Sequence, residues 1–169
     1  MNIKWVIKRV IKSCSWLLLT LWFPAAMVVT VGTASANEPF GMFKDTASLE
    51  PDRVLVLLAE VENCSFCKRV KNDFLLPLTL DLKWEPLFQV RRIDLNSQAI
   101  VTDFTGQKIS QQELSQAFNA DFSPTVMFIH PRTGQRIGED IVGLVTPDFY
   151  GFYLQQQITQ SYNKITGQL

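Results

Sequence analysis

The chain has 169 residues, with 16 basic and 16 acidic side chains, three cysteines and one histidine. This length suits one domain built around one core. The balanced charge lacks the basic excess that nucleic-acid-binding proteins carry, so no nucleic-acid partner is expected.

The N-terminal segment has the pattern of an export signal. Its opening is basic and is followed by an uncharged, mostly apolar stretch over residues 16–31. Ala34-Ser35-Ala36 supplies the small-x-small pattern that precedes a cleavage site. We expect residues 1–36 to be a signal peptide that directs the chain to the periplasm or another exported location. The uncharged stretch 13–37 is also long enough to span a bilayer, so an uncleaved membrane anchor is the alternative.

Cleavage after Ala36 changes both the charge and the cysteine content of the chain. All 16 acidic residues lie beyond position 36, whereas four basic residues precede it, so the mature chain is mildly acidic. Cys14 is lost with the signal, which leaves Cys64 and Cys67 in a compartment where disulfides persist. A zinc site would then need Asp or Glu ligands or a second chain. Lys68 follows Cys67, which excludes the C-x-x-C-H haem attachment motif.

Cys64-Ser65-Phe66-Cys67 is the motif that carries chemistry. It follows the short apolar stretch 54–61, which is typical of a buried central strand, and precedes a predicted helix from Ser65 to about Leu76. On a first helical turn such a pair can close a disulfide, and the free N–H groups there favour the thiolate of the first cysteine. A redox-active dithiol is the favoured interpretation. A structural disulfide is the alternative, although so short a loop constrains the unfolded chain little.

The helix after the motif is expected to bury Phe66, Val70 and Phe74, which recur at four-residue spacing. Pro77 is expected to end it. Its polar side chains are expected to face solvent, and these are Lys68, Arg69, Lys71 and Asn72. Residues 37–52 are interpreted as an N-terminal leader with a short amphipathic piece, and residues 53–169 as the folded domain.

The second half of the chain predicts strand, helix, hairpin and helix. Residues 88–95 alternate enough to form a second strand. Ser110-Gln111-Gln112-Glu113 is a capping box, which predicts a helix to Ala117 or Phe118. A strand over 126–129 is expected to pair with residues 135–142 across a Pro-Arg-Thr-Gly turn. Proline at the first helical position in Thr146-Pro147-Asp148 predicts the start of a C-terminal helix.

This order of elements resembles the thioredoxin family, and four pieces of sequence carry the resemblance. They are the apolar strand leading into Cys64 and Cys67, Ser123-Pro124-Thr125 before a second apolar strand, the Thr133-Gly134 hairpin, and Gly143-Leu144-Val145-Thr146-Pro147 before the last helix. The stretch 101–106, followed by the capping box, looks like the insertion of secreted thioredoxin-related proteins of the SoxW type. The resemblance implies an α/β thioredoxin fold: a central mixed β-sheet flanked by helices, with a short helical insertion before the cis-proline strand.

The family also implies roles for individual residues. Cys64 would be the exposed attacking thiol and Cys67 the buried resolving thiol, which releases the mixed disulfide. Pro124 matches the family's cis proline, which leaves the backbone of Ser123 free to pair with an extended client segment. An ordinary trans proline is the alternative, and simple packing is the alternative for Phe66. The expected client-binding residues are Phe66, Ser123, Pro124 and Thr125.

One departure from the family affects proton transfer. Familiar cytosolic thioredoxins have a buried Asp six residues before the first cysteine, and here that position is Leu58. Water, Glu60 or Glu62 would then carry the proton, although the favoured interpretation of both glutamates is as solvated loop charges. Arg91 and Arg92 are interpreted as solvated strand charges. Acidic side chains near the sulfurs would oppose the Cys64 thiolate and basic ones would favour it, so the direction of the pKa shift is left open.

The resemblance implies an exported thiol:disulfide oxidoreductase that reduces client protein disulfides. It would be a monomer without cofactor or metal, supplied with electrons by a membrane thiol carrier. Oxidation or isomerisation of disulfides is the alternative within the same fold. A binding module is the alternative from another class: a copper chaperone using Cys64, Cys67 and His130, or a redox-inactive scaffold.

Overall fold

The computed structural model describes residues 38–168. The predicted signal peptide or anchor at residues 1–36, with Cys14, lies outside the described residues. No helix between residues 38 and 168 has both the length and the apolar character needed to cross a membrane. The strands are β1 (Val54–Glu60), β2 (Phe88–Asp94), β3 (Ile100–Thr102), β4 (Lys108–Ser110), β5 (Thr125–Ile129) and β6 (Ile141–Val142). The helical elements are η1 (Thr46–Ser48), α2 (Ser65–Arg69), η2 (Val70–Leu75), α3 (Leu76–Leu80), η3 (Glu85–Leu87), α4 (Gln111–Ala117) and α5 (Pro147–Thr166).

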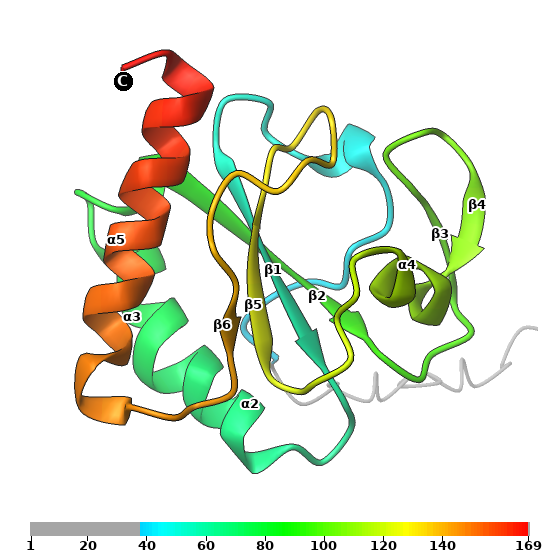
Figure 1. Cartoon of the computed structure of the whole chain (residues 1–169), viewed down its shortest axis with the longest axis horizontal. Coiled ribbons are helices and arrows are strands. Elements are labelled where there is room, and N and C mark those ends of the chain that lie inside the picture. The colour runs from blue at the N-terminus through cyan, green and yellow to red at the C-terminus, as the bar shows by residue number, and fades with distance from the viewer. Residues whose placement is uncertain (1–37, 169) are drawn as a thin grey trace, which may run out of the picture. The chain divides into compact units, whose positions relative to one another are not determined.

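The main sheet has the strand order β2-β1-β5-β6 (Figure 1). Strand β1 pairs in parallel with β2 and antiparallel with β5. All seven residues of β1 are buried, as its continuous apolar run predicts for a central strand covered on both faces. A mixed sheet with helices on both faces confirms the predicted α/β thioredoxin fold. The short strands β3 and β4 form a separate hairpin, which together with α4 makes the predicted insertion.

The two faces of β1 contribute to two different hydrophobic cores. Val54, Val56 and Leu58 pack with apolar side chains from η2, α3 and α5. The alternate residues of β1 pack with α4 and with the N-terminal segment. Figure 1 shows this division, with α2, α3 and α5 on one side of the sheet and α4 with the β3–β4 hairpin on the other. The end of β1 and the start of α2 are thereby fixed between two packed layers.

The helix that begins at Ser65 continues past Pro77 to Leu80, so the predicted end at Pro77 was wrong. The reason is a π-helical turn, η2, in which the N–H of Leu76 donates to the carbonyl of Lys71, five residues earlier. Proline lacks an N–H, and its ring crowds the preceding turn of an α-helix. Pro77 thus falls in the first turn of α3, the α-helical segment that follows the π turn, and proline is tolerated in a first helical turn.

The side chains that this helix buries differ from those predicted. Val70 is buried and Phe74 is partly buried, as predicted, but Phe66 is 55% exposed. Lys71 was expected to face solvent, yet its side chain is only 5% exposed. Lys71 follows the buried Cys67 by four residues and so lies on the same face of the helix, whereas Phe66 lies ahead of that face on the first turn.

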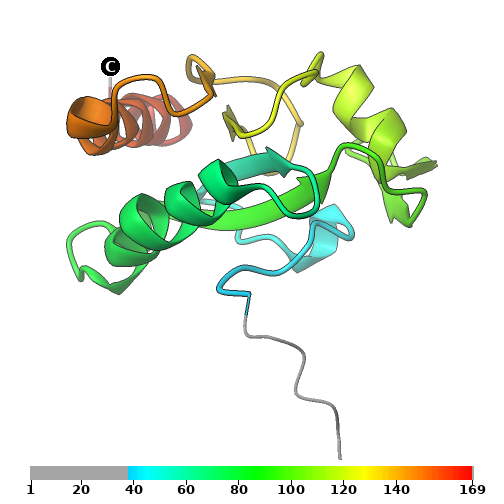
Figure 2. The same ribbon diagram turned by 90° about the horizontal axis from the view of Figure 1, so that it is seen from below.

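Residues 38–52 pack closely against the sheet. The N–H of Arg92 in β2 donates to the carbonyl of Gly41 at 3.1 Å, and the N–H of Phe43 donates to the carbonyl of Arg92 at 2.8 Å. The Phe43 side chain is fully buried in the core that contains α4. Figure 2 shows this segment in cyan, running along the sheet on the side away from α5.

Local signals predicted the later elements well. The capping box is formed: the Ser110 Oγ accepts from the N–H of Glu113 at 3.1 Å, and the Glu113 Oε2 accepts from the N–H of Ser110 at 2.7 Å. These bonds from Ser110 hold the pKa of Glu113 below its ordinary value. Helix α4 ends at Ala117, and α5 begins at Pro147.

The predicted partner strand of β5 is shorter than expected. Only Ile141 and Val142 form β6, and Arg136 makes a single isolated bridge to Ile129. The chain between them bulges away from the ladder at Gly138, where a Cβ atom would lie 2.6 Å from the Ser161 hydroxyl of α5. A close approach of the backbone to α5 therefore replaces strand pairing in the middle of this hairpin.

Candidate redox site

Cys64 and Cys67 form a disulfide at the start of the helix that follows β1. Cys64 is the N-cap residue, and the N–H of Cys67 donates to the Cys64 Sγ at 3.0 Å. Cys67 is 1% exposed, whereas Cys64 is only partly buried. This difference in exposure is what an attacking cysteine and a resolving cysteine require, and the N–H aimed at Cys64 Sγ would also stabilise its thiolate.

Ser123 brings a hydroxyl group directly against the disulfide. Its Oγ lies 3.0 Å from Cys67 Sγ and 3.6 Å from Cys64 Sγ, and it accepts the N–H of Val61 at 3.1 Å. The sulfurs of a disulfide carry no hydrogen, so the hydroxyl is the donor in these contacts. The sequence predicted only a backbone role for Ser123. A hydroxyl residue immediately before the proline was the signal for this side-chain contact.

We expect Ser123→Ala to make the disulfide harder to reduce. The thiolate of the reduced form is a stronger acceptor than a disulfide sulfur, so the hydroxyl stabilises the reduced state more. Loss of about 1 kcal/mol of this preference lowers the reduction potential by about 20 mV. Equilibration with dithiothreitol buffers measures the shift. Ser123→Thr keeps the hydroxyl and should restore the wild-type potential; an equal shift in both variants would contradict the role of the hydroxyl.

The other predicted client-binding residues differ in whether their backbone or side-chain groups are accessible to a client. The Ser123–Pro124 peptide bond is cis, and the Pro124 carbonyl accepts the N–H of Gly143 at 2.7 Å. Within residues 38–168 the backbone of Ser123 makes no main-chain hydrogen bond, which leaves it available for pairing. Thr125 is buried, and its hydroxyl donates to the Phe122 carbonyl at 2.8 Å, so its side chain is not available to a client.

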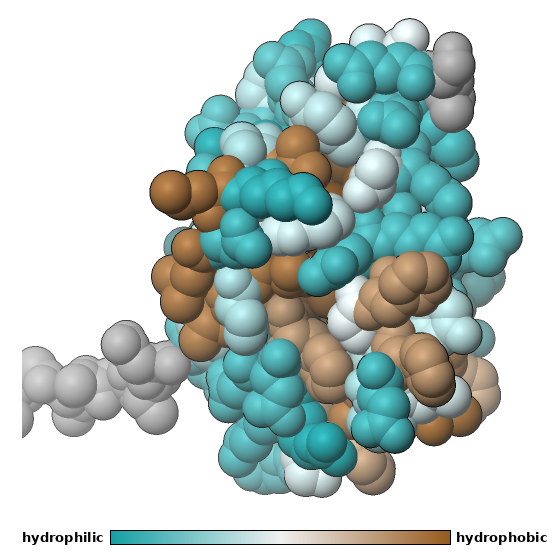
Figure 3. Space-filling model, turned by 90° about the vertical axis from the view of Figure 1, so that its left-hand side faces the viewer, coloured by the Kyte–Doolittle hydropathy of each residue, from teal (hydrophilic) through white to brown (hydrophobic). Residues whose placement is uncertain are grey.

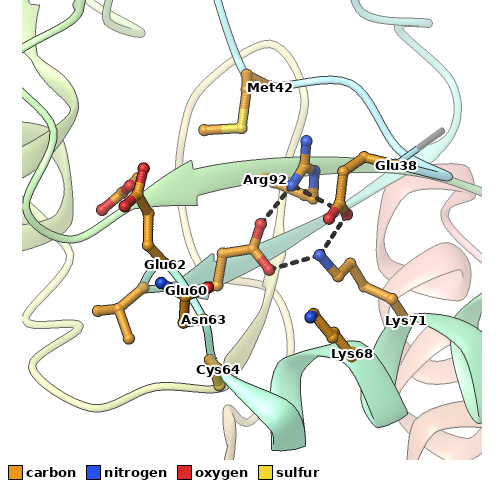
Figure 4. A pocket seen from close by; sticks show the side chains of 11 residues that line it. Glu38, Met42, Glu60, Glu62, Asn63, Cys64, Lys68, Lys71 and Arg92 are labelled. Atoms are coloured by element: carbon orange, nitrogen blue, oxygen red, sulfur yellow. Dashed lines mark hydrogen bonds and ion pairs between the residues drawn. The ribbon is translucent and has the colours of Figure 1, made fainter. Parts of the chain in front are cut away.

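A cluster of buried charges lies beside Cys64 (Figure 4). Glu60, the last residue of β1, has its Oε1 2.5 Å from Arg92 Nη1 and its Oε2 3.0 Å from Lys71 Nζ. Glu38 contacts both cations as well. The interpretation of Glu60 and Arg92 as solvated charges was therefore wrong. Pairing of β1 with β2 brings Arg92 to the end of β1, and Lys71 reaches it from the buried face of the helix. Glu62 is exposed, as expected of a loop charge.

These contacts also bear on proton transfer. Both carboxylate oxygens of Glu60 are engaged by cations, which favours water over Glu60 as the proton carrier for the dithiol. Hydrogen bonding and charge from Lys71 hold the pKa of Glu38 below its ordinary value, although burial opposes this shift. Glu38 is thus an anion at neutral pH.

The charged side chains line a pocket of about 450 Å³ that opens beside Cys64. Volumes of a few hundred Å³ are typical of sites that bind small molecules or side chains. In Figure 4 the Glu60 carboxylate lies between Lys71 and Arg92, with Lys68 between Lys71 and Cys64. The pocket lining is Glu38, Met42, Glu60, Val61, Glu62, Asn63, Cys64, Lys68, Lys71, Arg92 and Asp94.

His130 is not brought to this site. It follows the last residue of β5, Ile129, which pairs with Leu55 near the start of β1, whereas the disulfide follows the other end of β1. Four residues of strand, roughly 13 Å, separate these two ends of the ladder. Between residues 38 and 168, no group of three His, Cys, Asp or Glu side chains could hold a metal ion. The proposed copper ligand set is therefore not assembled here.

Comparison with known proteins gives likenesses of fold only. No protein-family model matches the chain, and no curated protein matches its sequence. A thioredoxin-fold protein from Helicobacter pylori is 20% identical, covering 73% of this chain and 89% of that protein, with a TM-score of 0.45. Thioredoxin from Fasciola hepatica is 16% identical, covering 72% and 99%, with a TM-score of 0.48. The periplasmic thioredoxin SoxS from Paracoccus pantotrophus is 16% identical, covering 64% and 99%, with a TM-score of 0.44.

Proposed function

We propose that this chain is an exported thiol:disulfide oxidoreductase that reduces the disulfides of client proteins. The observation that carries the proposal is the Cys64–Cys67 disulfide at a helix start, with one sulfur partly exposed, the other buried, and the Ser123 hydroxyl against both. Burial keeps client disulfides away from the resolving cysteine, Cys67. The partly exposed Cys64 remains accessible, both to attack a client disulfide and to be attacked by a thiol.

The reaction balances within the dithiol and the client. The Cys64 thiolate attacks one sulfur of the client disulfide, forming a mixed disulfide and releasing the other sulfur as a thiolate. Cys67 then loses its proton to water and attacks Cys64 Sγ, which releases the second client thiolate and forms the Cys64–Cys67 disulfide. The client gains two electrons and the dithiol loses two. The Cys67 N–H and the Ser123 hydroxyl stabilise negative charge on the sulfurs during these steps.

Exposed apolar side chains surround the disulfide and suit the docking of an unfolded or extended client. Phe66 lies between the two cysteines, Phe122 precedes Ser123, and Val145 follows the Gly143 that bonds Pro124; all three side chains are exposed. Apolar surface also interrupts the hydrophilic face formed by α3 and α5 (Figure 3). Apolar patches of this kind mark interaction sites on soluble proteins.

The direction of electron flow, the location and the partners are parts of the same proposal. The only cysteines of the mature chain form this one pair, and the insertion made by β3, β4 and α4 resembles that of SoxW-type proteins. Both features favour a reductant that acts as a monomer in the periplasm and receives electrons from a membrane thiol carrier. Residues 1–36 would serve as a cleaved signal or as a membrane anchor.

The reduction potential of the Cys64–Cys67 couple tests the proposed direction. The mature domain is equilibrated in glutathione or dithiothreitol buffers, and free thiols are counted. A potential near −270 mV, the region of thioredoxin, is expected for a reductase, whereas a potential near −120 mV would make the protein an oxidant. Absence of a reversible couple would contradict the oxidoreductase and favour a redox-inactive scaffold.

A further inference from the structure

The charge cluster beside Cys64 contains more buried positive than buried negative charge. Lys71, Arg92 and Glu60 come from the helix, β2 and β1, and their side chains are 5%, 12% and 9% exposed. Two cations thus share one carboxylate within the packed layers. A buried charge without a partner is costly, so the cluster requires a second anion.

Glu38 supplies that anion from outside the layers. One oxygen, Oε2, contacts both Lys71 Nζ and Arg92 Nη1, the latter at 3.3 Å. The Glu38 side chain is 43% exposed and belongs to the N-terminal segment, not to the sheet or its covering helices. Solvent therefore reaches the Glu38 carboxylate, whereas the two cations that it pairs with are buried. A second carboxylate in its place would keep both buried cations paired, so the exchange itself costs little.

The position of this contact connects it to the redox chemistry. Glu38, Lys71 and Arg92 line the same pocket as Cys64, and Figure 4 shows their charged ends gathered beside the Glu60 carboxylate. A ligand that placed a carboxylate on the two cations would hold its neighbouring atoms inside the pocket that Cys64 also lines. Holding a reacting group close to a nucleophile is an effective way to accelerate its reaction.

We propose that Lys71 and Arg92 form a carboxylate-binding subsite of the reductase, which Glu38 fills in this structure and which a substrate carboxylate takes over during reaction. The inference rests on the proposed function and names its preferred substrates: disulfides with an acidic group close to one sulfur. Arg92 offers a planar fork of donors that suits a carboxylate, and Lys71 adds a point charge. Glu38 is then an internal competitor of the substrate.

The variant Glu38→Gln tests the subsite, because it removes the competing charge and keeps the shape of the side chain. The reduced domain is mixed with oxidised glutathione, which carries carboxylates, and with the neutral hydroxyethyl disulfide, and loss of protein thiols is timed. We expect the rate with oxidised glutathione, divided by the rate with hydroxyethyl disulfide, to rise about fivefold, the effect of one ion pair whose carboxylate is open to solvent.

Glu62→Gln is the matched control. Glu62 lines the same pocket, is exposed, and forms no ion pair with any residue in the part of the chain that the structure describes. Like Glu38→Gln, the variant Glu62→Gln removes one negative charge near Cys64. A general electrostatic effect would therefore raise the ratio of the two disulfide reduction rates equally in both variants. An equal rise of this ratio in both variants, or no rise with Glu38→Gln, would overturn the proposed subsite. The proposed function would still be upheld in that case if the protein reacts with hydroxyethyl disulfide. Failure of both disulfides to react would overturn the proposed function and the subsite with it.

Discussion

Replacement of Cys64 by serine is expected to abolish disulfide reduction, lowering the rate by about a thousandfold or more, as loss of a nucleophile does in other enzymes. Cys64 carries the accessible sulfur of the pair, and a serine hydroxyl is far less nucleophilic than a thiolate at neutral pH. The assay is the reduction of insulin by dithiothreitol in the presence of the mature domain, followed by the turbidity of the released chains.

Cys67→Ser is the informative companion variant. It retains the attacking thiol but lacks the resolving one, so a mixed disulfide between Cys64 and the client should accumulate. Mass spectrometry after mixing with a disulfide-containing peptide detects the adduct. If Cys67→Ser formed no adduct while Cys64→Ser did, the assignment of the two roles would have to be reversed.

Replacement of Lys71 by methionine is expected to lower the free energy of unfolding by about 3 kcal/mol, because it leaves a buried carboxylate with one partner fewer. Lys71 is 5% exposed and lies 3.0 Å from the Glu60 carboxylate, which is itself almost fully buried. Methionine has similar length and no charge, so the loss comes from the ion pair more than from packing. Urea unfolding followed by circular dichroism measures the change.

A second variant on the same helical segment provides the comparison. Asp73 pairs with Arg69 at 3.4 Å, and both side chains are about half exposed. Asp73→Asn should therefore change the free energy of unfolding by less than about 0.5 kcal/mol. The double variant Lys71→Met/Glu60→Gln also removes the charge of the Glu60 carboxylate, which Lys71→Met leaves with one partner fewer. It should therefore recover part of the free energy of unfolding lost in Lys71→Met. If Lys71→Met and Asp73→Asn changed the free energy of unfolding equally, the buried Lys71–Glu60 pair would contribute no more to stability than the exposed Arg69–Asp73 pair.

Those parts of the fold that depend on local signals could be predicted from the sequence. The continuous apolar run of β1 is enough to predict a buried central strand. The capping box at Ser110 predicts a helix start because its two hydrogen bonds form between neighbouring residues, Ser110 and Glu113. Proline at the first position of α5 likewise needs no distant partner. The dithiol followed from the same kind of reasoning, because Cys64 and Cys67 lie on one helical turn.

The charge cluster could not be predicted in this way. Glu60, Lys71 and Arg92 meet because β1 and β2 pair in one register and because Lys71 lies on the same buried helix face as Cys67. The strand register has no strong local signal, and the predicted buried stripe of Phe66, Val70 and Phe74 placed Lys71 on the solvent side. The contact of the Ser123 hydroxyl with the sulfurs likewise depends on how β5 packs beside β1.

The two outer strands of the sheet have a consequence for association. Residues 41–43 already bond to β2 at Arg92 along its outer edge, and β6 at the opposite edge is only two residues long. Long unpaired strand edges are the places where copies of a protein join into aggregates. Within residues 38–168, the main sheet thus has little free strand edge onto which the strands of another copy could pair. Contacts made through the exposed side chains of Phe66 and Phe122 would therefore lack a long backbone edge along which further copies could add.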